Sequence, residues 1–133
     1  PNFELIVKKS WLAQNGATAE TVLEAMLDME RTMAKDQNAY ASWVHKINPQ
    51  LSEADAGDVW KVLTDSGYWA VNGGVNLGGA QTALDTYLKA QNQSANNNLP
   101  KASAAFDTGP LKAALDKMGV VNDSKDVPDW YGK

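Results

Sequence analysis

The side chains of this sequence that could carry acid–base or metal chemistry begin with a single histidine, His45. The chain has no cysteine, so it offers no thiolate ligand, no cysteine nucleophile and no disulfide. A lone imidazole is a poor zinc site, and His45 forms half of no recognisable catalytic dyad. We therefore interpret His45 as a structural or exposed residue.

A group of carboxylates follows Ser52 at positions Glu53, Asp55 and Asp58. These acids could act in general acid–base catalysis, but their spacing is that of a helix N-terminus, where serine caps the backbone and acids are stabilised by the helix dipole. The EF-hand calcium pattern is not met here. A reaction through Asp55, Asp58 and His45 would lack a paired base and nucleophile. The sequence therefore predicts no enzyme, no cofactor and no metal site.

A glycine-rich segment with two aromatic residues, residues 68–79, is the third place where chemistry could occur. Asn72-Gly73 is a strong turn signal because both residue types tolerate positive φ. The segment lacks the Lys-Ser/Thr of a P-loop and follows no strand of a βαβ unit, so nucleotide binding is not expected. A helix N-terminus after such a loop can still hold a small anion. The alternatives are a structural turn and a loop that contacts a ligand.

The elements that position these residues are expected to be mainly helices, because the sequence shows helical periodicity. Apolar side chains recur at intervals of three and four, and Ser52, Asn76, Pro110 and Gly119 mark helix ends. The sequence predicts a short helical turn from Lys9 to Gly16, a long helix from Thr18 to Asp36 capped by Thr18 or Thr21, a helix over 38–47, one from Ser52 to Gly67, one beginning at Asn76, and a last one capped by Asp107 or Thr108. A polar stretch at 91–100 is expected to be a loop or linker.

The long helix carries an apolar row that includes Met26, Met29 and Met33. These methionines could form an adaptable binding surface, but methionine more often fills gaps in a core, and we expect a core stripe. Phe3–Val7 is the one segment with strand character, because it alternates and then fills with β-branched residues. A single strand cannot pair its own backbone. It must pair with a weaker local strand, a second copy, or the missing part of a larger sheet.

The composition limits the classes of protein that remain. The chain has 133 residues, a net charge of −4 and no basic run, which argues against a nucleic-acid binder. No apolar run is long enough to cross a membrane, and no signal peptide is visible at the start of the sequence. We expect one mainly α-helical domain or fragment over residues 1–133, with about five to six helices and one N-terminal strand.

The order of these elements resembles a known family. The strand, the acidic helix capped by Ser52, the aromatic Asn-Gly-Gly loop and a Phe-Asp-x-x-Pro-Leu stretch that begins at Phe106 are similar to the C-terminal portion of periplasmic solute-binding proteins of ABC importers. The similar members are those that bind nitrate, sulfonates and thiamine precursors. Members of that family have two α/β lobes and are more than twice as long, so the resemblance implies a fragment, a proteolytic product or one chain of a split protein.

The resemblance sets our leading hypothesis, which is a periplasmic solute-binding component, or a fragment of one, that captures a small polar or anionic solute. It implies pocket-lining roles for Trp69, Asn72 and Asn76, and as partners the missing N-terminal lobe or a membrane permease. The alternative is a self-associating helical interaction module without a small-molecule ligand, in which Phe3–Val7 pairs with its own copy in a homodimer.

Overall fold

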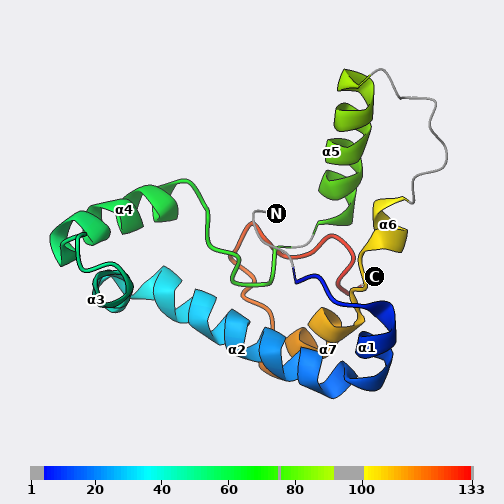
Figure 1. The fold of residues 1–133 in the computed structure, drawn as a ribbon, viewed down its shortest axis with the longest axis horizontal. Helices are drawn as coiled ribbons and strands as arrows, with labels where there is room; N and C mark the ends of the chain where they lie inside the picture. Colours follow the sequence, from blue (N-terminus) through cyan, green and yellow to red (C-terminus); the bar gives the residue numbers. More distant parts are fainter. Residues whose placement is uncertain (1–4, 75, 92–100, 133) are drawn as a thin grey trace.

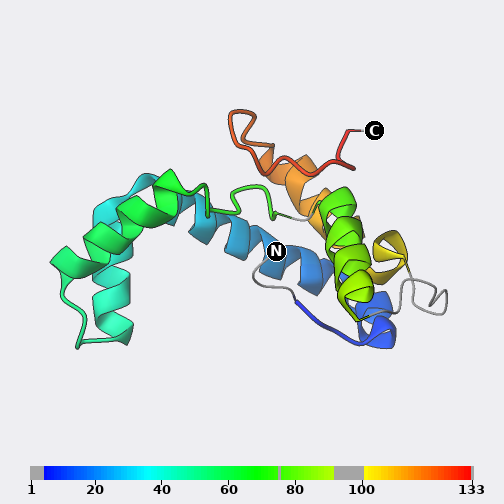
Figure 2. The same ribbon diagram turned by 90° about the horizontal axis from the view of Figure 1, so that it is seen from above.

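The computed structural model describes residues 5–74, 76–91 and 101–132, and within them the chain forms seven helices and no strand. The helices are α1 (Lys9–Gln14), α2 (Gly16–Lys35), α3 (Gln37–Ile47), α4 (Glu53–Asp65), α5 (Leu77–Ala90), α6 (Ala102–Ala105) and α7 (Gly109–Met118). The long helix α2 forms the spine of the molecule, with α1 and α7 near its beginning and α3 and α4 projecting from its other end (Figures 1 and 2).

The main core lies between α2 and α7. Leu27 of α2 and Leu111, Ala114 and Leu115 of α7 are buried together, because each helix carries an apolar stripe at helical spacing. The segment after α7, residues 119–132, which we call the tail, folds back over this core. Side chains packed around the core are Leu23, Met118, Val120, Trp130 and Tyr131.

Helices α3 and α4 form a separate packing unit, which we call the arm. Ala41 of α3 and Ala56 and Gly57 of α4 are buried, and these small side chains allow the two helices to approach closely. The Gln37 side chain donates a hydrogen bond of 2.9 Å from Nε2 to the Gly57 carbonyl. The arm is therefore held together by contacts of its own, apart from the main core.

A third packing unit joins α5 to α6. Leu88 and Ala102 are buried there, and the Gln81 side chain accepts a hydrogen bond of 2.9 Å from the Ala102 amide at the start of α6. Neither buried residue belongs to the cluster between α2 and α7. The described part of the chain thus has three small packing units and not one continuous core.

Most helix predictions are confirmed. Ser52 caps α4, Asn76 caps α5, and Gly119 ends α7 with φ of 75°. The prediction of Thr18 or Thr21 as the cap of the long helix is wrong: α2 begins at Gly16 directly after α1, so both threonines lie inside it. The short helix α6 was not expected, and most of the predicted polar loop at 91–100 lies outside the described residues.

The predicted strand Phe3–Val7 is not observed. Residues 3 and 4 lie outside the described residues, and Leu5, Ile6 and Val7 are neither helix nor strand. The physical reason is that a strand needs a neighbour, and the described part of the chain supplies none. Ile6 is 90% exposed, and Leu5 and Val7 are about half exposed, so the described part of the chain covers this apolar segment only in part.

The expected methionine core stripe is also wrong in part. Met26 and Met29 are exposed and Met33 is only half-buried, because α2 turns Leu23 and Leu27 toward α7 and leaves the methionine row facing outward. No described helix has the length and apolar character needed to cross a membrane.

The main core predicts a clear contrast between two substitutions. Leu115 is completely buried, so Leu115→Ala is expected to lower the free energy of unfolding by about 3 kcal/mol through lost burial and a cavity. Val62 is exposed on α4, so Val62→Ala is expected to change it by less than about 0.5 kcal/mol. Urea unfolding followed by circular dichroism measures both, and equal effects would contradict this placement of the core.

Candidate functional site

The segment between α4 and α5 forms a tight turn, and we call residues 68–74 the aromatic loop. The Gly73 amide donates a hydrogen bond of 2.8 Å to the Ala70 carbonyl, and Gly73 has φ of 84°. A Cβ atom at Gly73 would lie 2.8 Å from the terminal carbons of Leu111, so any other residue would have to displace that side chain and adopt a strained positive φ. A turn forms at this place, as predicted, but its central residues are Val71 and Asn72, one position before the predicted Asn72-Gly73 pair.

Charged side chains hold the backbone of three consecutive loop residues. The Ala70 amide donates to Glu30 Oε2 at 3.3 Å, the Val71 carbonyl accepts from Arg31 Nε at 2.9 Å, and the amide of the next residue donates to Asp126 Oδ2 at 2.7 Å. Glu30 and Arg31 belong to α2, and Asp126 belongs to the tail. Because hydrogen bonds to charged groups are stronger than neutral ones, these contacts fix the course of the loop.

Arg31 also binds the end of α7. Its Nη2 atom donates to the Gly119 carbonyl at 2.7 Å, and its Nη1 atom lies 3.4 Å from the Met118 carbonyl. One planar guanidinium therefore joins α2, the aromatic loop and the beginning of the tail. These three segments come from distant parts of the sequence, with Arg31 separated from Gly119 by 88 positions.

Asn72 has no exposed surface and uses its side chain within the protein. Its Nδ2 atom donates to the Val121 carbonyl at 3.0 Å and to Asp126 Oδ1 at 3.1 Å, and its Oδ1 atom accepts from the Val121 amide at 2.9 Å. Asn72 therefore clamps the loop to the tail. A direct contact between Asn72 and a ligand, as the resemblance implies, stays a prediction.

Asn76 lies at the beginning of α5 and is exposed. Its Oδ1 atom accepts from the Gly79 amide at 2.7 Å, which is the contact of a helix cap. Asp129 of the tail accepts from the next free amides of the same helix, those of Leu77 and Gly78, each at 2.9 Å. The amides that could have bound an anion here are thus occupied by protein oxygens, and a ligand role for Asn76 stays a prediction.

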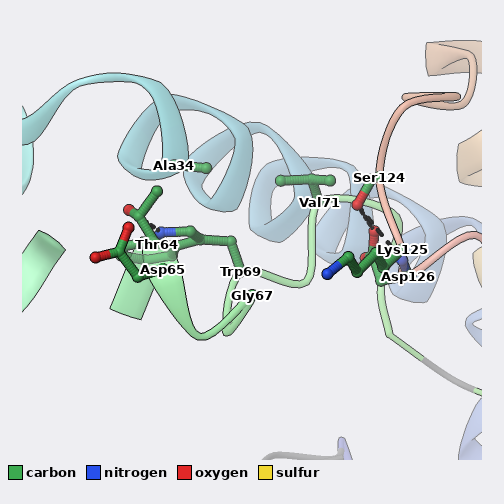
Figure 3. Close-up of a pocket in the computed structure, with 9 residues that line it drawn as sticks. All are labelled: Ala34, Thr64, Asp65, Gly67, Trp69, Val71, Ser124, Lys125 and Asp126. Atoms are coloured by element: carbon green, nitrogen blue, oxygen red, sulfur yellow. Dashed lines mark hydrogen bonds between the residues drawn. The ribbon is translucent and has the colours of Figure 1, made fainter. Parts of the chain in front are cut away.

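Trp69 is the member of the expected site that borders a cavity. This cavity is an open surface hollow of about 380 Å³ where the arm meets the spine, and we call it the crook pocket. Figure 3 shows Thr64, Asp65 and Trp69 on one side, with Ala34 above them, the tail residues on the other side, and Val71 between the two. Its lining residues are Ala34, Thr64, Asp65, Gly67, Trp69, Val71, Ser124, Lys125 and Asp126.

An aromatic cluster fixes the Trp69 ring. Its centroid lies 5.5 Å from that of Tyr40 and 6.1 Å from that of Tyr68, both in edge-to-face geometry. Its Nε1 atom donates to Thr64 Oγ1 at 3.0 Å. The indole is therefore held in place by groups of the arm and the loop, as a preorganised pocket wall requires.

The crook pocket carries charges of both signs. The Lys125 side chain is exposed and extends toward the side of the pocket where Trp69 lies (Figure 3). Asp65 stands at the end of α4, and Asp126 is bonded to Asn72 and to the Ser124 hydroxyl. The Asp126 carboxylate already accepts hydrogen bonds from groups of the protein. Lys125 and Asp65 are therefore the charged side chains that a solute in the pocket would contact.

The other residues considered for chemistry have local partners. His45 Nδ1 lies 2.8 Å from the Leu51 carbonyl and so closes the turn between α3 and α4. Asp55 and Ser52 form reciprocal capping bonds, and Asp58 pairs with Lys61 at 2.8 Å. Within the described ranges, no group of three or more His, Asp or Glu side chains could hold a metal ion.

Sequence reasoning missed the residues that organise the site, Glu30, Arg31, Asp126 and Asp129. On a helix pattern Glu30 and Arg31 are ordinary polar positions, and nothing local shows that they face a loop about forty residues away. The pair Asp126 and Asp129 brackets Pro128 in the tail, which is a turn signal at most. Only the tertiary fold brings these four side chains to the aromatic loop and the beginning of α5.

The clamp made by Asn72 predicts a loss of stability. Asn72→Ala leaves the Val121 backbone groups without their partner and removes one donor from Asp126, and is expected to lower the free energy of unfolding by about 2 kcal/mol. Asn122→Ala, at an exposed neighbouring position, is the matched control and is expected to have little effect. Thermal and urea unfolding measure the stability of both variants. If the Asn72→Ala protein is as stable as the control, the side-chain contacts of Asn72 do not contribute to stability.

The partly buried Glu30 carboxyl is expected to make the stability of the fold depend on pH. Burial raises the pKa of its carboxyl above the ordinary value of 4.5, the Ala70 amide opposes this, and the Asp126 charge adds to it. The folded protein therefore holds this proton more tightly than the unfolded chain does, and the contribution of Glu30 to stability falls as pH rises through its folded pKa.

The test compares wild type with Glu30→Gln, which keeps an oxygen that can accept from Ala70. We expect the free energy of unfolding of the variant to rise relative to wild type between pH 4 and pH 7, measured by urea unfolding at several pH values. A constant difference across this range would contradict the raised pKa.

Comparisons of the chain with protein-family models, with curated proteins and with solved structures return no match. The likeness to solute-binding proteins therefore rests on the order of the predicted elements, on the aromatic Asn-Gly-Gly loop and on the Phe-Asp-x-x-Pro-Leu stretch at Phe106.

Proposed function

We propose that this chain is a solute-binding component, or a fragment of one, of an ABC-type importer, and that it contributes one wall of a site for a small polar or anionic solute in the periplasm. The observation that carries the proposal is the fixed aromatic loop. Glu30, Arg31 and Asp126 hold its backbone, and Trp69 on the same loop borders an open hollow of about 380 Å³. A preorganised wall with an aromatic ring and a few polar groups is typical of small-molecule sites.

The surface left uncovered supports a role within a larger assembly. Val22, Met26 and Met29 lie on one face of α2 and are exposed, and the segment Leu5–Val7 is exposed as well. Apolar surface of this kind marks an interaction site in a soluble protein. The missing N-terminal lobe implied by the resemblance would cover it, and a membrane permease would be the further partner of the complete importer.

A chain that supplies only one wall of a binding site is expected to have low affinity for the solute. In a two-lobe binding protein most of the binding free energy comes from closure of both lobes on the solute, so the 133-residue chain alone should bind weakly. Lys125 is the only cation among the pocket residues, so the anionic part of a solute is expected to lie near it.

A titration of the labelled chain tests this directly. In nuclear magnetic resonance titrations with nitrate and with an aliphatic sulfonate, we expect shifts of the Trp69 indole and of residues 124–126, with saturation only above millimolar concentration. Lys125→Gln should weaken these shifts, whereas Lys101→Gln, an exposed lysine outside the pocket, should not. Micromolar binding by the chain alone, or shifts confined to other regions, would contradict the proposal.

A second function is favoured by the exposed apolar segment at the N-terminus. Ile6 is 90% exposed and Leu5 is 55% exposed, and a self-associating helical module could cover them by pairing Phe3–Val7 with its own copy. Native mass spectrometry separates the two functions. If a second polypeptide is bound to this chain and dissociates on denaturation, the solute-binding component is supported. If the chain forms a dimer with itself and Ile6→Lys abolishes that dimer, the self-associating module is supported.

A further inference from the structure

The arm is attached to the rest of the molecule by two short connections. Figures 1 and 2 show α3 and α4 projecting from the end of α2, away from α5, α6 and α7. The two helices pack mainly on each other, and α3 makes fewer contacts with α2. We propose that the arm turns as a rigid body about these two connections and so widens and narrows the crook pocket.

The first connection is Asp36. Its backbone has φ of −126° and ψ of 97°, which is outside the helical region. The hydrogen bonds of α2 end at the Asp36 amide, which donates to the Thr32 carbonyl, and those of α3 begin at the Asp36 carbonyl, which accepts from Tyr40. The Asp36 side chain caps α3. A change of the backbone angles at this residue therefore turns α3 against α2 without breaking a hydrogen bond of either helix.

The second connection is Tyr68-Trp69. The Tyr68 amide still donates to the Leu63 carbonyl of α4 at 3.0 Å, in a cap that depends on Gly67 with φ of 68°. The Ala70 amide is already bonded to Glu30 of α2. Only the backbone between these two amides is free to absorb rotation. The arm thus has one short hinge on each of its two chain connections.

Two hydrogen bonds hold the arm in its present position, and the edge-to-face contact of Trp69 with Tyr40 of α3 adds to them. Trp60 Nε1 of the arm donates at 2.6 Å to the carbonyl of Met33, near the end of α2, where helix carbonyls lack partners within the helix. Trp69, which lies within the second connection, donates from Nε1 to Thr64 Oγ1 of the arm at 3.0 Å. Both hydrogen bonds are donated by indole groups at partly exposed positions, so a modest free energy separates the present position from others.

Rotation of the arm changes the crook pocket because the pocket has walls from both sides. Thr64 and Asp65 belong to the arm, whereas Ala34, Val71 and the tail residues belong to the rest of the molecule. Thr64 and Asp65 lie opposite the tail residues in Figure 3, with Ala34 beside Thr64. A molecule bound between them would fix the angle of the arm, whatever its identity, so this inference does not depend on the proposed function.

Spin labels on introduced cysteines test the inference, since the chain has none of its own. One pair of labels, at Ala25→Cys on α2 and Lys46→Cys on α3, measures the arm against the spine. The second pair, at Lys46→Cys and Val62→Cys, measures distances within the arm. All of these positions are exposed. Pulsed electron spin resonance gives the distribution of distances for each pair.

The two hydrogen bonds are removed by Trp60→Phe, which keeps an aromatic ring without the indole donor, and by Thr64→Val, which keeps the side-chain size without the hydroxyl acceptor. The matched control is Trp11→Phe with Thr86→Val, which makes the same changes elsewhere. We expect the contact variant to broaden the distribution between arm and spine and to leave the distribution within the arm unchanged. The inference is overturned if the arm-to-spine distribution equals that of the control, or if both distributions broaden together, because the arm would then not be a rigid body.

Discussion

The structure depends on the pairing of three consecutive backbone groups of the aromatic loop with charged side chains. A loop without regular structure must satisfy its backbone donors and acceptors in some way. Here Glu30 and Arg31 serve Ala70 and Val71 from α2, and Asp126 serves the next amide from the tail. The loop is therefore built from long-range contacts and would have no fixed course without them.

The same contacts explain how a chain with little apolar core keeps a defined shape. Arg31 ties the end of α7 to α2, and Asp129 caps α5 from the tail. Polar contacts thus join units whose own cores are small, and the arm is joined to the rest by its chain connections at Asp36 and Tyr68-Trp69 and by few further contacts, among them the hydrogen bond of Trp60 to Met33. A molecule of this kind can combine a rigid loop with a movable arm, and the crook pocket lies where the two meet.

Local signals in the sequence predict the helices well but not the surfaces they present. Ser52, Asn76 and Gly119 mark helix ends because caps act over a few residues. Periodicity identifies an apolar row such as that of Met26 and Met29 but not whether a partner covers it, and here it is exposed. The strand at Phe3–Val7 is a similar case, since its pairing depends on a neighbour that periodicity does not specify.

The candidate site was predicted only in part, for the same physical reason. A turn close to Asn72-Gly73 follows from local conformational preference, and Trp69 borders the pocket. The burial of Asn72 against Val121, 49 positions away, depends on how the tail crosses the loop. No local pattern encodes that crossing.

The most direct test of this account is hydrogen exchange at the Ala70 and Asn72 amides in the native protein. The account predicts that both exchange far more slowly than an unprotected loop amide, and that Asp126→Ala, which removes the acceptor, speeds exchange at Asn72 more than at residues within α3 and α4. If both amides of the wild type exchange at the rate of an unfolded peptide, the charged side chains do not hold the loop, and the central claim is contradicted.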